Sequence, residues 1–229
     1  MVDLDLDTSR THVAVLISGR GSNLKALIEA GQRPEAPFDI ALVISNRPGA
    51  GGLGVAEAAG IPSLVIDHKT FDGREPFERA LDQKLNEAGV RLVCLAGFMR
   101  LLTPWFVERW RDRLLNIHPS LLPAFKGLDT HARALEAGVR VHGCTVHLVR
   151  AELDDGPILV QGTVPVLKDD TEGSLAARVL EVEHQAYPLA LDLIVTGRAQ
   201  LVDGRMAVDG AKAPTICWTN PQGSDDLDL

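Results

Sequence analysis

One stretch of the sequence combines an apolar run, two prolines and two polar side chains: Leu114-Leu115-Asn116-Ile117-His118-Pro119-Ser120-Leu121-Leu122-Pro123. Residues 114–117 are typical of the end of a buried strand. Proline donates no backbone hydrogen bond to a sheet and fixes φ, so the chain must leave the sheet near Pro119. Asn116 and His118 are thereby placed at the carboxyl end of a strand, and their spacing of two puts both side chains on one face.

Ligands bind at this edge of the sheet in α/β proteins, which makes Asn116 and His118 candidate catalytic residues. An amide donor can stabilise a developing oxyanion, and an imidazole can transfer a proton. The alternative is a core histidine beside a turn-forming asparagine, which is the commoner role of these residue types. The position at a strand end between prolines favours the catalytic interpretation.

The composition is that of a soluble globular protein, with 229 residues, 45% hydrophobic and 24% charged, and a net charge of −8. The acidic balance argues against a nucleic-acid binder, because those proteins usually carry basic stripes. No apolar run reaches the roughly 18 residues of a membrane span, and residues 1–7 lack the features of a signal peptide. The three cysteines are far apart and form no C-x-x-C pair, so neither a disulfide framework nor a zinc site is indicated. We therefore expect a reduced, cytoplasmic protein without a metal, and the sequence leaves a homodimer open.

Apolar runs alternate with helical patterns in the first half of the chain, which predicts a mostly parallel sheet with right-handed crossovers. The expected strands are 12–18, 40–44, 64–66, 92–96 and 114–117. One helix is expected to follow the first strand and to end at Ala30, and two more are expected at 53–59 and 76–88.

The pattern changes after Pro123. A short helix is expected at 131–137, and the segments 141–149 and 158–166 alternate as two antiparallel strands do. A long closing helix is expected at 172–196, with a kink or a break at Pro188. The predicted fold class is α/β: a doubly wound, mostly parallel sheet with an antiparallel C-terminal extension and a long closing helix. A single domain over 1–229 with a loose acidic tail at 221–229 is the simplest organisation.

A glycine-rich loop, Gly19-Arg20-Gly21-Ser22-Asn23, follows the first strand and opens a helix. Helix N-termini offer free N–H groups and a partial positive charge, so a phosphate fits there. The fingerprint of dinucleotide-binding proteins is incomplete here. Leu24 stands where that fingerprint has its third glycine, and Ser45-Asn46 stands where it has an acidic residue after the second strand. The loop therefore suits a single phosphate monoester better than NAD or ATP. A tight strand–helix turn capped by Ser22 is an equally good interpretation from this segment alone.

An acidic loop, 152–157, joins the two late strands, and the default role of such a loop is a solvated turn. A carboxylate close to His118 would favour its imidazolium form, and Asp154 or Asp155 could supply it. The spacing does not choose between them. His142 and His147 lie five apart, hence on opposite faces of a strand, and structural or surface roles are expected for both.

Several segments together resemble the folate-dependent formyltransferases, most closely the members that serve purine biosynthesis. The resemblance covers about residues 12–210. The matching segments are 15–24, 95–100, 114–123, 143–147, Val160-Gln161 and Glu183-His184-x-x-Tyr187-Pro188.

The resemblance implies that the amine of glycinamide ribonucleotide attacks the formyl carbon of the co-substrate 10-formyltetrahydrofolate, with no metal. It implies that Asn116 binds the formyl oxygen and that His118, as imidazolium, stabilises the oxyanion and assists proton movement. Asp154 matches the loop aspartate that keeps this histidine charged, whereas Asp155 stands where a small residue is common.

The resemblance also implies two binding regions: a ribonucleotide phosphate-binding half at about 12–110 and a folate-binding, catalytic half at about 111–210. It assigns Gly21, Ser22 and Asn23 to the ribonucleotide phosphate and Glu183 to the substrate amine. The implied folate contacts are Arg74, Met99, Arg100, Leu101, Leu102, Asn116, Ala151, Glu152, Leu153 and Asp154. One departure is Leu180, which occupies a position that is often polar or basic, so phosphate binding rests more on the backbone loop.

Three rival functions share parts of this pattern. Methionyl-tRNA formyltransferases share the histidine motif but carry an added C-terminal tRNA-binding domain, and formyltetrahydrofolate deformylases carry an extra N-terminal domain. A non-catalytic small-molecule sensor on the same sheet would not need Asn116, His118 and Asp154 together.

Overall fold

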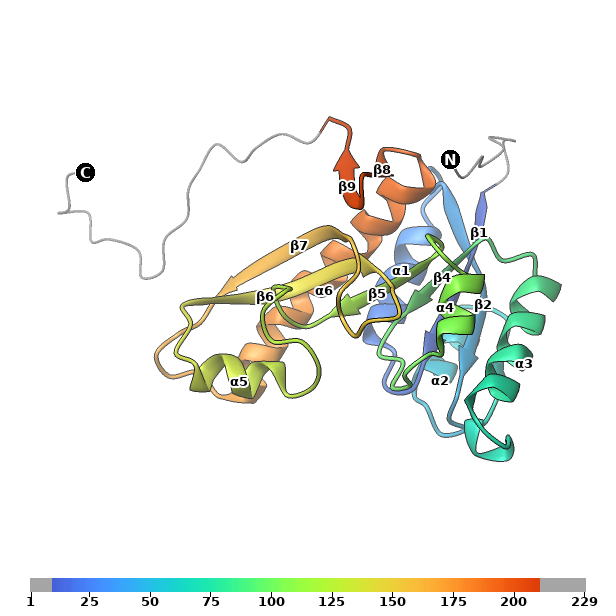
Figure 1. Cartoon of the computed structure of the whole chain (residues 1–229), viewed down its shortest axis with the longest axis horizontal. Coiled ribbons are helices and arrows are strands. Elements are labelled where there is room, and N and C mark those ends of the chain that lie inside the picture. The colour runs from blue at the N-terminus through green and yellow to red at the C-terminus, as the bar shows by residue number, and fades with distance from the viewer. Residues whose placement is uncertain (1–9, 211–229) are drawn as a thin grey trace. The chain divides into compact units, whose positions relative to one another are not determined.

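The structure is a computed structural model that describes residues 10–210, and Figure 1 shows its elements in chain order. The expectations for residues 1–7, for Cys217 and for the acidic tail lie outside the described residues. The strands of the main sheet are ordered β3-β2-β1-β4-β5-β6-β7, and β8 and β9 form a separate pair. The predicted α/β fold class is thereby confirmed.

The chain divides into two compact units. Among the described residues, the N-terminal unit consists of the chain up to Asn116 together with Leu148–Ala151, and the C-terminal unit consists of Ile117–His147 and residues 152–210. The single functional domain stays a prediction.

Parallel strands form the centre of the N-terminal unit. The strands are β1 (Thr11–Ile17), β2 (Phe38–Ser45), β3 (Ser63–Val65), β4 (Leu92–Leu95) and β5 (Leu114–His118), the last of which continues into the C-terminal unit. The pairs β1–β2, β1–β4, β2–β3 and β4–β5 are all parallel, as predicted. The helices are α1 (Ser22–Gly31), α2 (Gly52–Ala58), η1 (His68–Thr70), α3 (Arg74–Glu87) and α4 (Pro104–Arg109).

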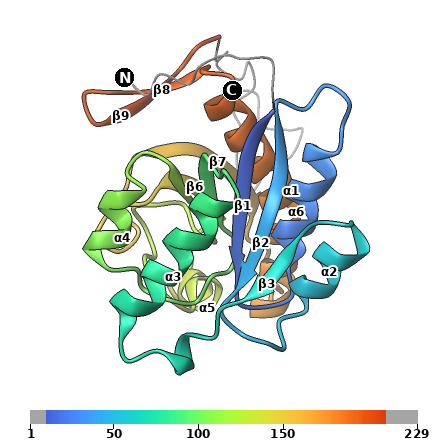
Figure 2. The ribbon, with the colours of Figure 1, turned by 90° about the vertical axis from the view of Figure 1, so that its right-hand side faces the viewer.

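Helices cover both faces of these strands. Figure 2 shows α3 and α4 on one side of β1 and β2, and α1 and α2 on the other. Residues 13–17 of β1 are fully buried, which is why the strand reads as a continuous apolar run rather than an alternating one. Phe77 and Leu81 of α3 pack with Ala14 and Leu16 in one hydrophobic cluster.

An antiparallel pair and a long helix dominate the C-terminal unit. Its elements are α5 (Thr130–Glu136), β6 (Val141–Leu148), β7 (Ile158–Pro165), α6 (Glu172–Val195), β8 (Ala199–Val202) and β9 (Arg205–Val208). β6 and β7 pair antiparallel, as predicted. A Cβ at Gly162 of β7 would lie 2.1 Å from Val182 Cγ1, so only glycine lets α6 approach the strand this closely.

The break expected at Pro188 is wrong, because α6 runs unbroken through it. A proline removes one backbone hydrogen bond, whereas Tyr187, Ala190 and Leu191 are buried around it and hold the helix in place. A kink there stays a prediction. Among residues 10–210, no helix has the length and apolar character needed to cross a membrane.

Candidate active site

The strand end predicted at β5 is confirmed. β5 ends at His118, directly before Pro119, and the Ser120 N–H donates to the His118 carbonyl at 2.9 Å to turn the chain. Asn116 is half-buried and His118 is 5% exposed. The predicted pair therefore lies where the strand leaves the sheet.

Both ring nitrogens of His118 face groups that can only accept a hydrogen bond. Nε2 lies 3.0 Å from the backbone oxygen of Phe125, and Nδ1 lies 3.4 Å from Oδ2 of Asp154. A carbonyl oxygen cannot donate, so Nε2 carries the proton. If Nδ1 carried no proton, its lone pair would face the carboxylate of Asp154. Both side chains are less than 10% exposed, so water would screen that repulsion poorly. The ring of His118 is thus held between a carbonyl oxygen and a carboxylate, which fixes its orientation at the end of β5.

The two loop aspartates have different surroundings. Asp154 adopts φ 50° and accepts the Gly127 N–H at 2.9 Å, in addition to facing His118. The carboxylate of Asp155 is 54% exposed and pairs with the ammonium of Lys126. The solvated-turn interpretation thus fits Asp155 and is wrong for Asp154, and the structure brings only Asp154 to His118.

Side chains of β6 and β7 hold the segment that follows His118. The Thr145 hydroxyl donates to the Ser120 carbonyl at 2.7 Å and accepts the Leu122 N–H at 3.0 Å. The Gln161 amide donates to the Leu122 carbonyl at 2.9 Å. The chain after β5 is thereby fixed by side-chain bonds that a strand pattern alone does not reveal.

Two further histidines lie beside His118. The rings of His131 and His142 meet edge to face with centroids 5.3 Å apart. Burial lowers the pKa of both, to about 4 for His142, and the neighbouring His118 lowers them further. His142 and His147 are 1% and 2% exposed, so the surface role considered for them is wrong. No group of three potential metal ligands occurs within residues 10–210.

The glycine loop of the N-terminal unit is shaped by its backbone. Gly21 is the N-cap of α1 and adopts φ 82°. A Cβ there would lie 2.5 Å from Cα of Gly52, and the Gly52 N–H donates to the Gly19 carbonyl at 3.0 Å. Ser22 is the first helical residue, so the interpretation of Ser22 as the cap is wrong. Ser22 and Asn23 are half-exposed at the helix start.

The predicted folate segment presents apolar side chains to solvent. Met99 is 60% exposed and Leu101 57% exposed, while Arg100 and Leu102 are half-buried. The Met99 N–H donates to the buried Ser18 hydroxyl at 2.8 Å, which fastens one end of the segment.

The other end of the segment is held by Glu78. The Thr103 N–H donates to Oε1 of Glu78 at 2.8 Å, and the Thr103 hydroxyl donates to Oε2. Burial raises the pKa of Glu78, which lies one turn after the exposed Arg74 on α3. Sequence reasoning missed Ser18 and Glu78, because a lone serine and a helical glutamate carry no distinctive pattern.

The remaining predicted residues are on the acidic loop and on α6. Ala151, Glu152 and Leu153 are exposed at the start of the acidic loop. Glu183 is 8% exposed on α6, and its charge adds to burial in raising the pKa of the Cys144 thiol to about 12. Leu180 is half-buried one turn before Glu183.

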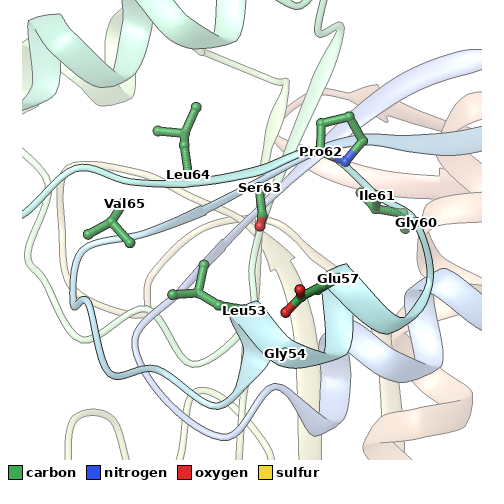
Figure 3. A pocket seen from close by; sticks show the side chains of 9 residues that line it. All are labelled: Leu53, Gly54, Glu57, Gly60, Ile61, Pro62, Ser63, Leu64 and Val65. Atoms are coloured by element: carbon green, nitrogen blue, oxygen red, sulfur yellow. The ribbon is translucent and has the colours of Figure 1, made fainter.

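A separate pocket of about 680 Å³ lies between α2 and β3 in the N-terminal unit (Figure 3). It is lined by Leu53, Gly54, Glu57, Gly60, Ile61, Pro62, Ser63, Leu64 and Val65. None of the predicted site residues lines it, so it forms no part of the candidate site.

Comparisons with known proteins agree on one family. Residues 11–191 match the family described as formyl transferase. The chain is 50% identical over 213 residues to the trifunctional purine biosynthetic protein adenosine-3 of Gallus gallus, covering 93% of this chain and 20% of that protein. It is 42% identical over 212 residues to phosphoribosylglycinamide formyltransferase of Escherichia coli strain K12, covering 93% of this chain and 97% of that protein.

A solved structure shows the same fold. Glycinamide ribonucleotide transformylase 1 from Symbiobacterium toebii superimposes with a TM-score of 0.85 at 45% identity, over 87% of this chain and 94% of that one. The chain spans about a fifth of the length of the trifunctional relatives and nearly all of the bacterial ones.

Proposed function

Because the chain belongs to the formyl transferase family, we propose that it transfers a formyl group from 10-formyltetrahydrofolate to the amine of glycinamide ribonucleotide. The relatives named for this substrate support the proposal. The single observation that carries it is His118, which is enclosed by the Phe125 carbonyl and the Asp154 carboxylate at the end of β5.

The reaction needs an amine to displace another nitrogen at a formyl carbon. The substrate amine attacks that carbon, a C–N bond forms, and negative charge collects on the formyl oxygen. The bond to N10 of the folate then breaks. Across the step the attacking nitrogen loses one proton and the leaving nitrogen gains one, so the site must stabilise an oxyanion and move a proton.

Asn116 and His118 divide these tasks. The Asn116 amide donates to the formyl oxygen, and the imidazolium charge of His118 stabilises the oxyanion. In the described geometry both ring N–H groups already have acceptors. His118 therefore delivers a proton only by exchanging one partner for the leaving nitrogen, and the ion-pair contact to Asp154, at 3.4 Å, is longer than the 3.0 Å contact to the Phe125 carbonyl.

The binding roles follow the family resemblance. Gly21, Ser22 and Asn23 hold the ribonucleotide phosphate, and Glu183 holds the substrate amine. Arg74, the segment 99–102, Asn116 and the loop 151–154 contact the folate. The exposure of Met99 and Leu101 supports the assignment of the segment 99–102, since two exposed large apolar side chains close together in sequence are available to cover a pterin ring.

One assay tests the proposal. Purified full-length chain is given 10-formyltetrahydrofolate with glycinamide ribonucleotide, with methionyl-tRNA, or with water alone, and the release of tetrahydrofolate is measured. We expect rapid release with the ribonucleotide only. Release with tRNA would identify the tRNA enzyme, release with water alone would identify a deformylase, and no release in any arm would favour a sensor.

The proposal includes a cytoplasmic location, which agrees with the lack of any disulfide pattern among the three cysteines. It also includes a homodimer as one state of the chain. Light scattering on the purified protein distinguishes a dimer from a monomer.

A further inference from the structure

An arginine outside the predicted site organises the loop that encloses His118. We propose that Arg133, on α5, is a positioning residue that aims Asp154 at His118. The proposal rests on the formyl transfer proposed above, because it assigns Arg133 a part in that reaction. Its test is arranged so that each proposal can fail alone.

Arg133 reaches back to the loop 125–128. Its Nη1 donates to the Lys126 carbonyl at 2.6 Å and to the Leu128 carbonyl at 3.2 Å. Its guanidinium lies over the Phe125 ring, 5.7 Å from the centroid. One exposed side chain thus contacts three of the four loop residues.

The same loop supplies two backbone groups to the catalytic pair. The Phe125 carbonyl accepts from Nε2 of His118 at 3.0 Å, and the Gly127 N–H donates to Oδ2 of Asp154 at 2.9 Å. These groups are directed by the conformation of the loop, in which Phe125 and Gly127 adopt φ 53° and φ 81°. Residues other than glycine rarely hold such a conformation unless their surroundings impose it.

Arg133 and Asp154 meet opposite ends of one peptide unit. The Lys126 carbonyl that accepts from Arg133 belongs to the planar peptide whose N–H comes from Gly127. A cation at the oxygen and a carboxylate at the N–H polarise the peptide in the same direction, which strengthens both hydrogen bonds. Arg133 therefore fixes the orientation of the donor that holds Asp154, and Asp154 in turn faces His118 at 3.4 Å.

The competing interpretation is a purely structural tether. An arginine that joins α5 to the preceding loop could stabilise the fold and do nothing for catalysis. A tether changes the free energy of unfolding, whereas a positioning residue lowers kcat only as long as Asp154 is present. The two interpretations therefore differ in a double-mutant cycle.

The cycle compares the wild-type protein, Arg133→Ala, Asp154→Asn and the double variant. We expect kcat of Arg133→Ala to fall about tenfold, since small misplacements of catalytic groups are costly, while the KM of both substrates changes little. Adding Arg133→Ala to Asp154→Asn should lower kcat no further. Arg133→Lys, which keeps the charge and a donor, should recover part of the loss.

Two controls complete the design. Arg111→Ala removes an exposed arginine that pairs with Glu108 in the N-terminal unit, and it should leave kcat unchanged. Arg133→Gln keeps an amide donor without the charge, and the same cycle run with it stays informative if the alanine variant does not fold.

Three results separate the proposals. A wild-type kcat in both Arg133→Ala and Arg133→Gln would overturn the positioning role. Losses that multiply in the double variant would overturn it too, because Arg133 would then act independently of Asp154. A wild-type protein that makes no formylated ribonucleotide would instead overturn the proposed function.

Discussion

The loop around His118 and the glycine loop before α1 are built by different means. At His118, charged side chains and directed backbone groups set the chemistry. At the glycine loop, the shape comes from a backbone that admits no side chain at Gly21. Changes of side-chain charge should therefore damage the first region most, and changes of backbone freedom should damage the second.

The largest effect is expected at His118. His118→Ala should lower kcat by about 10²–10⁴-fold, the usual contribution of a general acid–base group, and leave the fold intact. Steady-state kinetics together with circular dichroism check this expectation. Near-normal turnover in a folded variant would remove His118 from the catalytic residues.

The second-largest effect is expected from Asp154→Asn, which removes a negative charge and keeps the size of the side chain. Asp154→Asn should lower kcat while leaving the fold intact, because the ring of His118 loses the carboxylate that faces it at 3.4 Å. Steady-state kinetics over a range of pH measure the loss. The other titratable groups near His118 are His131 and His142, whose pKa values are lowered by burial, and Glu172, which faces His131.

The matched control for that charge is the neighbouring aspartate. Asp155→Asn breaks only the exposed pair with Lys126, a type of contact worth about 0–1 kcal/mol, so its profile should match the wild type. A large defect in Asp155→Asn beside an unchanged Asp154→Asn would reverse the assignment of the two aspartates.

A single methyl group tests the backbone region. Gly21→Ala should reduce the free energy of unfolding by about 1–3 kcal/mol and raise the ribonucleotide KM, because φ 82° and the 2.5 Å approach to Gly52 both exclude a Cβ. Gly19→Ala is the matched control, since its Cβ would meet nothing within 4 Å. Denaturant titration and ribonucleotide KM measure the pair, and equal behaviour of the two variants would contradict the backbone argument.

The smallest effects are expected from side chains of the same loop. Ser22→Ala and Asn23→Ala should each raise the ribonucleotide KM about 2- to 13-fold, which corresponds to about 0.5–1.5 kcal/mol of lost hydrogen bonding, with smaller changes in kcat. Folate affinity should barely change. Loss of folate binding with an unchanged ribonucleotide KM would show that the loop serves the other substrate.

Periodicity and proline placement were sufficient to predict most of the fold. Continuous apolar runs marked the buried parallel strands, and Pro119 placed the end of β5 within one residue. The hairpin β8–β9 was missed although Asp203-Gly204 stands at its turn, a strong signal for two-residue hairpin loops. The helix α4 was missed too, despite Thr103 as N-cap and Pro104 at its first position.

The site could be predicted only in part. His118 and Asn116 followed from local spacing, because strand geometry fixes which residues share a face. The spacing alone could not choose between Asp154 and Asp155, since the choice depends on a left-handed conformation at Asp154 and on Lys126 from a distant loop. Arg133 acts through backbone carbonyls, which no pattern of side chains encodes.

The buried thiol of Cys144 allows the opening of the C-terminal unit to be measured by chemical labelling. A pKa of about 12 leaves roughly 10⁻⁵ of the thiol ionised at neutral pH, and the thiolate is the form that reacts with alkylating reagents. Cys144 should therefore resist iodoacetamide while β6 stays covered and react once the strand opens. The alkylation rate of Cys144 then reports how often the C-terminal unit opens. Mass spectrometry of the peptide that contains Cys144 measures this rate without an introduced probe.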